Sequence, residues 1–314
     1  MSLERVTLRD ASSQSSATVL VGFGFNCFEF CAVRPGRAVD VLWSAPGFSG
    51  GGQRASGSGI PLLFPFPGRM PGTVFRWEGR EYLLDAGDGR GNAIHGFVLD
   101  RPWRLVERTA CRVTGEFQAS VDDPPLLERW PADFRLRVTY RLAGETLSAD
   151  IVIDNPDHRP LPFGFGTHPY FRVPLGGPRA EDCMVRWPVA HRWELVNMLP
   201  TGRRVEDAEL AAYRAGVEFR HLQVDDVFGG LQFQGDWCVA EIRDPGSGAV
   251  VTLRFDRAFR ECVVYTPPHR EAICIEPYTC VPGACELARQ GIDGGFRVLA
   301  PGASFRARLE ICVD

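Results

Sequence analysis

Apolar and polar residues alternate along several stretches of the chain, and this period of two constrains the fold more than any other feature. In the stretch 134–142, FRLRVTYRL, every second residue is apolar and the residues between are arginine or threonine. The same alternation returns at 147–154, 251–255 and 305–313. Successive side chains of a strand point to opposite faces of a sheet, so these segments form strands with one buried and one solvated face. The pattern is typical of antiparallel sheets.

Helical periodicity is scarce. The best candidate is 207–214 (DAELAAYR), and short helical turns are expected at 126–130 and 285–289. The 34 glycines and 24 prolines supply the turns that many short strands require. No strand–helix–strand rhythm appears, which argues against Rossmann folds and TIM barrels. We therefore predict an all-β fold with few short helices, in which residues 1–314 form one domain built as a large antiparallel two-layer sandwich.

The charge, the N-terminal sequence and the cysteines indicate the partners and the compartment to expect. The net charge is −4 and the arginines are scattered, which gives no basis for binding nucleic acid or an anionic membrane. The N-terminal sequence MSLERVTLRD is charged and lacks the apolar core of a signal peptide. The ten cysteines form no CxxC pair and most lie in apolar runs, which favours free thiols over disulfides or a metal site. We expect a cytoplasmic protein.

Four polar residues stand in unusual apolar, glycine-rich or proline-rich surroundings. His168 precedes Pro169 in THPYFR, and a residue before proline is restricted to extended conformations. The other three are His95 in NAIHGFV, Arg69 in FPFPGRM and Glu276 in ICIEPYT. Taken singly, each histidine is more often structural than catalytic, and the arginine could equally be an ordinary ion-pair partner. Together, two histidines, an arginine and a glutamate are residue types that a small polar site would contain.

Glu276 is the hardest of these residues to explain as purely structural. In an extended segment 271–278, Ile273 and Ile275 face one way, while Cys274 and Glu276 face the other. Carboxylates are rarely buried without a partner. Glu276 is therefore either an acid or base positioned for a chemical role, or a member of a structural ion pair. Asp225 and Asp226 are adjacent, so only one of them can face a given side of a strand.

Other motif searches favour neither a metal nor a cofactor. The stretch 85–92, DAGDGRGN, resembles a calcium loop but lacks the EF-hand spacing, so we expect a turn there. Neither HxH nor HExxH occurs, and a metal site would have to be assembled from residues distant in the sequence. We therefore predict no metal and no cofactor.

Taken in order, the polar motifs resemble those of the aldose 1-epimerase (galactose mutarotase) family. The resemblance rests on Arg69 in PFPGRM, His95 in IHGFV, His168 in THPYF, Asp225 in VDDVF and Glu276 in EPYT. It extends along nearly the whole chain, and the HPYF stretch is its most specific element. Membership of this family implies a galactose mutarotase-like β-sandwich, with a sugar cleft on the concave face of a large antiparallel sheet, and a monosaccharide substrate.

The resemblance also implies a division of catalytic roles. His168 matches the general acid that protonates the ring oxygen, and Glu276 matches the general base that removes the proton of the C1 hydroxyl. His95 matches a second histidine that hydrogen-bonds the substrate near the ring oxygen. Opening a hemiacetal requires a proton delivered at one oxygen and another withdrawn elsewhere, and the roles reverse on closure.

Substrate binding is implied for two further polar residues. Arg69 and Asp225 match residues that hold sugar hydroxyls. Candidates for an aromatic face against the sugar ring are Trp43, Tyr170, Phe171 and Phe228, although each such residue is more often part of the core. Tyr170 is preferred among them as a binding residue. The chain departs from the best-characterised galactose mutarotases at Gly68, where those enzymes often carry an asparagine that contacts sugar. This departure leaves the sugar specificity open.

The preferred function is therefore an aldose 1-epimerase acting on a free aldose, and three alternatives stay open. A hexose-6-phosphate 1-epimerase would need an arginine cluster, for which the candidates are Arg54, Arg69, Arg76 and Arg90. A non-catalytic sugar-binding protein could use the same fold. Another isomerase or lyase could use the same acid/base pair on a sugar acid. The sequence fits a monomer or a homodimer, and it leaves open whether Cys280 lines the cleft.

Overall fold

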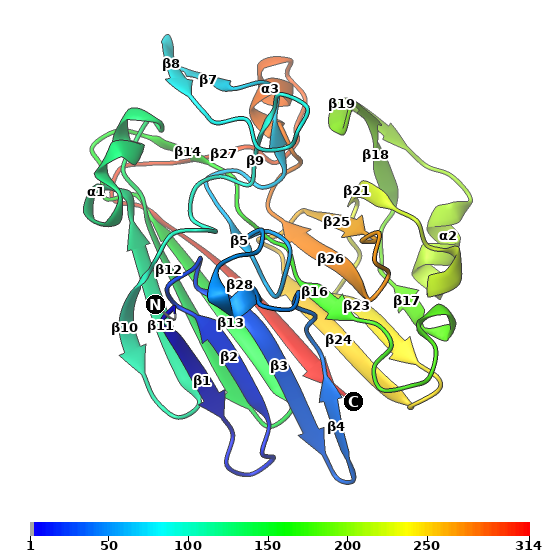
Figure 1. Cartoon of the computed structure of the whole chain (residues 1–314). Helices are drawn as coiled ribbons and strands as arrows, with labels where there is room; N and C mark the ends of the chain where they lie inside the picture. Colours follow the sequence, from blue (N-terminus) through cyan, green and yellow to red (C-terminus); the bar gives the residue numbers. More distant parts are fainter. Residues whose placement is uncertain (1–2) are drawn as a thin grey trace.

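The four alternating segments form one continuous part of a single sheet. In the computed structural model, which describes residues 3–314, they are β12 (Arg135–Ala143), β13 (Thr146–Asp154), β24 (Ala249–Asp256) and β28 (Ser304–Val313). They are consecutive neighbours in the order β12-β13-β28-β24, and every pair is antiparallel (Figure 1). The strand prediction is confirmed at all four positions.

Two large antiparallel sheets make up most of the molecule. The ten-stranded sheet adds β10 (Arg104–Arg108), β11 (Arg112–Gln118), β17 (Met184–Arg186), β20 (Val217–Glu218), β22 (Phe233–Gln234) and β23 (Trp237–Asp244) to the four strands above. The eight-stranded sheet contains β5 (Leu62–Leu63), β15 (Gly166–Thr167), β16 (Tyr170–Arg172), β18 (His191–Val196), β19 (Leu199–Val205), β21 (Asp225–Gly229), β25 (Glu261–Tyr265) and β26 (Ala272–Tyr278).

Smaller sheets complete the strand inventory. A four-stranded sheet contains β1 (Arg5–Arg9), β2 (Ser16–Leu20), β3 (Asn26–Arg34) and β4 (Arg37–Asp40). Three two-stranded sheets pair β6 (Arg69–Met70) with β9 (Ala93–Ile94), β7 (Val74–Trp77) with β8 (Arg80–Leu83), and β14 (Leu161–Phe163) with β27 (Arg297–Leu299).

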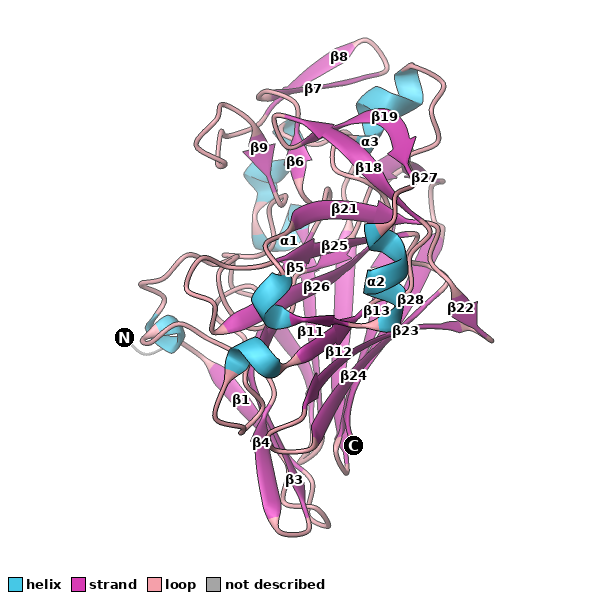
Figure 2. Cartoon of the chain, turned by 90° about the vertical axis from the view of Figure 1, so that its right-hand side faces the viewer, coloured by secondary structure: helices cyan, strands magenta, loops and turns pink. Residues whose placement is uncertain are grey.

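The main hydrophobic core lies between the two large sheets. It contains Val138 and Ile151 from the ten-stranded sheet together with Val264 and Ile275 from the eight-stranded sheet, all almost fully buried. Because both sheets contribute their apolar faces to one core, they pack as the two layers of a β-sandwich (Figure 2). The sandwich prediction is confirmed, and the assignment of all 314 residues to one domain stays a prediction.

Helices are few and short, as the sequence predicts. The expected helix at 207–214 is α2 (Glu209–Ala215), and the expected turn at 285–289 is α3 (Ala284–Arg289). The turn at 126–130 is a 3-10 helix over Pro124–Glu128, and α1 (Ala119–Asp122) was not predicted. Further 3-10 turns lie at Phe48–Gly50, Ala180–Asp182 and Phe219–His221. Among residues 3–314, no helix has the length and apolar character needed to cross a bilayer.

None of the ten cysteines forms a disulfide, which confirms the prediction of thiols rather than disulfides. Seven of them are buried and three are partly buried, so they serve mainly as small apolar side chains in the sandwich.

Gly96 is required by the close approach of two backbone segments beside the cavity described below. Its φ is +73°, and an added Cβ would overlap the carbonyl of Phe64, whose oxygen accepts a hydrogen bond from Phe97 N–H at 2.7 Å. We expect Gly96→Ala to lower the free energy of unfolding by about 3 kcal/mol or more, because the backbone must shift as well as adopt a strained φ. The measurement is urea denaturation.

Gly79→Ala is the matched control for this prediction. Gly79 has a φ of +76°, but an added Cβ would meet no atom within 4 Å. Only the conformational cost then applies, about 1–2 kcal/mol. Equal losses in the two variants would contradict the role assigned to the contact with Phe64.

Candidate active site

The side chains on one face of strand β26 point into the core, and those on the opposite face point into a cavity. Ile273 and Ile275 belong to the main core between the large sheets, whereas Glu276 and Tyr278 line the cavity. The sequence-based assignment of faces along 271–278 is therefore confirmed. The cavity lies on the face of the eight-stranded sheet that turns away from the ten-stranded sheet.

The register of neighbouring strands brings further side chains onto the same face. Val263 of β25 pairs with Glu276, and Tyr265 of β25 pairs with Asp225 of β21. All four of these residues line the cavity, whereas Asp226 does not. The expectation that only one of the two adjacent aspartates faces the site is confirmed.

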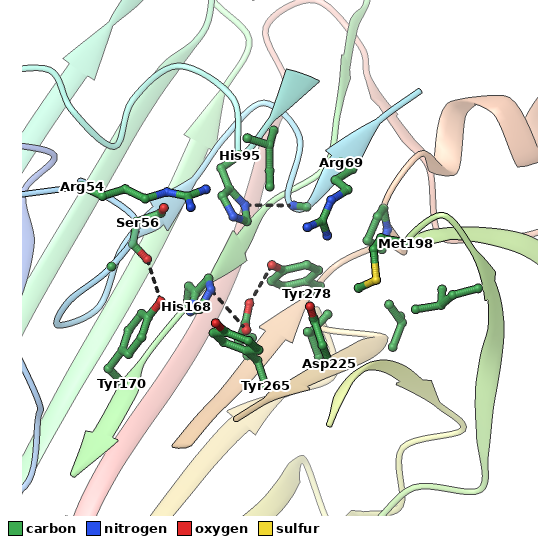
Figure 3. Close-up of a pocket in the computed structure, with 18 residues that line it drawn as sticks. Arg54, Ser56, Arg69, His95, His168, Tyr170, Met198, Asp225, Tyr265 and Tyr278 are labelled. Atoms are coloured by element: carbon green, nitrogen blue, oxygen red, sulfur yellow. Dashed lines mark hydrogen bonds and ion pairs between the residues drawn. The ribbon is translucent and has the colours of Figure 1, made fainter. Parts of the chain in front are cut away.

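All six residues proposed from the sequence line this one cavity, which has a volume of about 160 Å³ (Figure 3). They are Arg69, His95, His168, Tyr170, Asp225 and Glu276. The structure thus brings together segments that are up to about 200 residues apart in the sequence. The role of each residue stays a prediction.

His168 and Glu276 form the centre of the site. Nε2 of His168 lies 3.3 Å from Oε1 of Glu276, and both side chains are buried. The hydroxyl of Tyr278 donates a hydrogen bond of 2.7 Å to Oε2 of Glu276. The imidazole of His168 stacks on the ring of Tyr170, which is anchored by a 3.0 Å hydrogen bond from its hydroxyl to the carbonyl of Ser56. Each member of the pair is therefore held by a neighbouring tyrosine.

Burial shifts the pKa values of this pair in opposite directions. It lowers the pKa of His168 to about 3 and raises the pKa of Glu276 well above its usual range. Both shifts favour the neutral form, because neither charge is well solvated. With both groups neutral, the pair holds one transferable proton, which can move between the carboxyl group and the imidazole and can be passed to or taken from a bound ligand.

His95 is held in an unusual backbone conformation beside this pair. Its φ is +65°, and its Nδ1 accepts a hydrogen bond of 3.3 Å from the backbone N–H of Gly68. When the imidazole is neutral, its proton is therefore on Nε2. Burial, followed by the positive charges nearby, lowers the pKa of His95 well below its usual value. The ring centre lies 5.7 Å from that of His168, so His95 can present a neutral N–H donor next to His168 and Glu276.

Arg69 is positioned by the loop at 85–92. Its Nε donates to Oδ2 of Asp88 at 3.2 Å. Asp88 in turn accepts hydrogen bonds from the backbone N–H groups of Arg90 and Asn92 and from the side-chain amide of Asn92. The loop forms the turn that was expected, and it has the further effect of orienting Arg69 at the cavity.

Only two of the four arginines considered for a phosphate group reach the cavity. Arg54 and Arg69 line it, and after burial the charge of Arg54 is among the causes that lower the pKa of His168. Arg76 instead pairs with Glu81 at 2.8 Å in the β7–β8 hairpin. Arg90 is exposed in the loop at 85–92 and does not line the cavity.

Most of the remaining candidate residues lie outside the cavity. Of the four aromatic residues considered, only Tyr170 lines the cavity, because Phe171 and Phe228 are in the main core and Trp43 packs behind Tyr170. Cys280 does not line the cavity either. Burial raises the pKa of its thiol to about 12, so Cys280 is not a reactive thiolate at neutral pH.

Gly68 also has a local structural explanation. Its φ is +65°, and an added Cβ would lie 2.6 Å from Cγ of Pro282, which lines the cavity beside it. A larger residue at this position would therefore have to displace Pro282. Gly68 and Pro282 together form this part of the cavity wall.

Several lining residues were not proposed from the sequence as part of the site. They include Ser56, Leu195, Met198, Tyr265 and Tyr278. Tyr278 could have been found, because it lies two residues after Glu276 on the same strand and therefore on the same face. Tyr265 and Met198 reach the cavity only through strand pairing and a hairpin turn, for which the local sequence contains no signal.

The fold is shared with solved structures along the whole chain. A galactose mutarotase-like protein from Clostridium acetobutylicum aligns with 100% of this chain and 99% of its own at a TM-score of 0.88 and 20% sequence identity. A galactose 1-epimerase from Lactobacillus acidophilus aligns with 100% of this chain and 99% of its own at a TM-score of 0.75 and 17% identity. These similarities confirm the expected galactose mutarotase-like fold.

Sequence comparison gives the family. The Escherichia coli K12 protein YihR is 25% identical over 235 residues, which are 74% of this chain and 72% of YihR. The chromosomal LacX protein of Lactococcus lactis subsp. lactis is 27% identical over 158 residues, which are 49% of this chain and 48% of LacX. The family model described as aldose 1-epimerase matches residues 32–312. The chain therefore belongs to the aldose 1-epimerase family.

Proposed function

We propose that the protein is an aldose 1-epimerase that interconverts the α and β anomers of a free aldose. The observation that carries this proposal is the buried contact of 3.3 Å between His168 and Glu276 in the wall of the cavity. An imidazole and a carboxyl group that share one proton are suited to a reaction in which one oxygen gains a proton while another loses one.

The roles follow from the chemistry of hemiacetal opening. With the shared proton moved from Glu276 to His168, Glu276 accepts the proton of the C1 hydroxyl and His168 delivers its own proton to the ring oxygen, so that the C1–O bond of the ring breaks and an open-chain aldehyde forms. After rotation about the C1–C2 bond, the two proton transfers run in reverse and the ring closes as the other anomer. The total number of protons on the pair is unchanged, and no cofactor is needed.

The other lining residues are proposed to bind and orient the sugar. Arg69 and Asp225 hold hydroxyl groups, and Nε2–H of His95 donates a hydrogen bond near the ring oxygen. Tyr170 keeps the imidazole of His168 in place and covers the C–H face of the sugar. Arg69, His95 and Tyr170 are held by Asp88, Gly68 and Ser56 respectively before substrate enters, so little ordering of these three side chains is left for the binding step.

Polarimetry tests the proposal directly. Freshly dissolved α-anomers of glucose, galactose, arabinose and glucose 6-phosphate are followed with and without the purified protein. We expect faster decay of optical rotation for at least one free aldose. Binding of a sugar in calorimetry without any acceleration would instead indicate a non-catalytic sugar-binding protein.

The pH profile should identify Tyr278 as a positioning residue. Burial raises the pKa of Glu276, and the hydrogen bond from Tyr278 opposes this shift. We expect kcat/KM to fall on the alkaline side as the pair loses its single proton. In Tyr278→Phe this alkaline limb should move up by about one pH unit, because a hydrogen bond to a charged group contributes about 1.5 kcal/mol.

Tyr265→Phe is the control for this measurement. Tyr265 lines the same cavity, but its hydroxyl makes no hydrogen bond with Glu276. An alkaline limb that moves equally in both variants, or in neither, would contradict the proposed role of Tyr278.

A second candidate is the 1-epimerization of a phosphorylated hexose, which the positions of Arg54 and Arg69 favour. Both guanidinium groups line the cavity, and Arg54 lies in an exposed loop from which it could meet a phosphate at the cavity mouth. If glucose 6-phosphate is the substrate, Arg54→Gln should lower kcat/KM for it by tenfold or more and leave the value for glucose nearly unchanged. Equal kcat/KM values for the two sugars in the wild type would exclude this candidate.

A further inference from the structure

A third side chain with a metal-binding atom lies against the acid/base pair. Cys274 precedes Glu276 by two residues on β26, so both point to the same face, and it pairs with Tyr170 of β16. The thiol of Cys274, a ring nitrogen of His168 and a carboxylate oxygen of Glu276 all lie within 4.8 Å of one another, and all three residues are buried. Within residues 3–314 no other group of three His, Cys, Asp or Glu side chains is placed in this way.

These three atoms are the ligands that zinc prefers. Zinc binds thiolate, imidazole and carboxylate at about 2.0–2.3 Å, so ligand atoms of a tetrahedral site lie about 3.3–3.8 Å apart. His168 Nε2 and Glu276 Oε1 already have this spacing at 3.3 Å. Because all three atoms lie within 4.8 Å of one another, the thiol would have to approach by at most about 1 Å to reach this spacing.

The surroundings also suit a bound ion. Tyr278 donates its hydrogen bond to Oε2 of Glu276, which leaves Oε1 free to bind and fixes the orientation of the carboxylate. His168 and Glu276 line the cavity, so the fourth position of a tetrahedral ion would face the space that water or a substrate oxygen occupies. Magnesium and calcium prefer oxygen ligands, so a site with one thiol and one imidazole selects softer ions.

We propose that His168, Cys274 and Glu276 bind a thiophilic divalent cation, best fitted by Zn²⁺, and that this ion blocks the epimerase. The second part rests on the proposed function. The ion takes the lone pairs of His168 and Glu276 that carry the transferable proton, so a protein with bound zinc has no acid/base pair.

The release of protons makes the affinity of the site for Zn²⁺ depend on pH. A thiol and an imidazole–carboxyl pair must lose their protons to bind the ion, so binding of Zn²⁺ releases protons to solvent. The association constant should therefore rise with pH, whereas an ion held by carboxylates alone would show almost no change near neutrality.

Cobalt binding tests the site without any activity assay. Co²⁺ is titrated into the metal-free, full-length protein, and the cysteinate-to-cobalt charge-transfer band is recorded before Zn²⁺ is added to displace it. We expect one Co²⁺ per chain, a clear band, and complete loss of the band with Zn²⁺. Cys274→Ser should abolish the band and weaken Zn²⁺ binding at least tenfold. Absence of the band from the wild-type protein would overturn the proposal, and so would its persistence in Cys274→Ser.

Cys280→Ser is the matched control. Cys280 is also a buried, free cysteine, but it lies outside both the cavity and the group of three ligands. Its replacement should leave the cobalt band and the zinc affinity unchanged. If Cys274→Ser does not fold, Cys274→Ala replaces it, and the wild-type band and its pH dependence alone decide whether a thiolate binds the ion.

Inhibition is measured separately from binding. Zn²⁺ is titrated against the mutarotation rate, and each variant is compared with its own metal-free rate. We expect the wild type and Cys280→Ser to lose activity at the zinc concentrations that displace cobalt, and Cys274→Ser to need at least tenfold more. Binding with undiminished activity would overturn the blocking role. An inactive wild type that still shows the cobalt band would instead refute the proposed function and leave the metal site standing.

Discussion

Replacing Glu276 with glutamine is expected to lower kcat for mutarotation by about 10²–10⁴-fold, the range typical of a lost general base. The amide has nearly the same shape as the carboxyl group and can still accept the hydrogen bond from Tyr278, but it cannot take the proton of the C1 hydroxyl. KM should change little, because the substrate hydroxyls are held mainly by Arg69 and Asp225. The measurement is polarimetric determination of kcat and KM on the aldose that the wild type converts fastest.

Stability should not fall in this variant, which separates a chemical from a structural effect. The folded-state pKa of Glu276 is raised, so between the unfolded-state pKa and the folded-state pKa the folded protein holds a proton that the unfolded chain has lost. The free energy of unfolding therefore decreases as pH rises through this window. Glutamine removes this contribution, and Glu276→Gln should unfold at neutral pH at a temperature no lower than the wild type.

Glu261→Gln is the matched control for both measurements. Glu261 lies on the neighbouring strand β25, is buried, and accepts a 2.8 Å hydrogen bond from Trp193 Nε1. Burial raises its pKa to about 7, but it does not line the cavity. Its replacement should leave kcat within about threefold of the wild type. A comparable loss in both variants would mean that a buried carboxyl group matters for the fold rather than for proton transfer.

The sequence predicted those strands that are long enough to show the alternation of apolar and polar residues. Strands β12, β13, β24 and β28 have eight to ten residues each, and their alternation was visible without any knowledge of their partners. Strands β5, β15 and β16 have only two or three residues, which is too short for a period to appear. These short strands exist because they pair with longer ones, and pairing between distant segments has no local signal.

The same distinction applies to the site. Glu276 was singled out because a carboxylate on the polar face of an otherwise apolar strand needs an explanation, and the family resemblance then joined it to His168 and His95. Asp88 was overlooked because its stretch resembles an ordinary turn, and only the three-dimensional structure shows that this turn orients Arg69. A residue that acts by holding another residue is invisible until the two are seen in contact.

Replacing His168 with glutamine should cause a loss of kcat similar to that of Glu276→Gln, again about 10²–10⁴-fold. Glutamine can hydrogen-bond the ring oxygen of the sugar, but it cannot deliver a proton to it. The pKa of His168 is lowered to about 3 by burial, so the imidazole acts through the proton that it shares with Glu276. The activity of the wild type should therefore show no inflection near pH 6.5, where an isolated histidine would titrate.

The double variant His168→Gln/Glu276→Gln tests whether the two residues act as one unit. If they do, the double variant should be no more than about tenfold slower than either single variant, because removal of one partner already disables the proton transfer. If instead the loss in the double variant equals the product of the two single losses, the two groups act independently. His191→Gln is the control, since His191 lies on β18 outside the cavity and its burial also lowers its pKa. Its replacement should leave kcat nearly unchanged, which would assign the loss in His168→Gln to the acid/base pair.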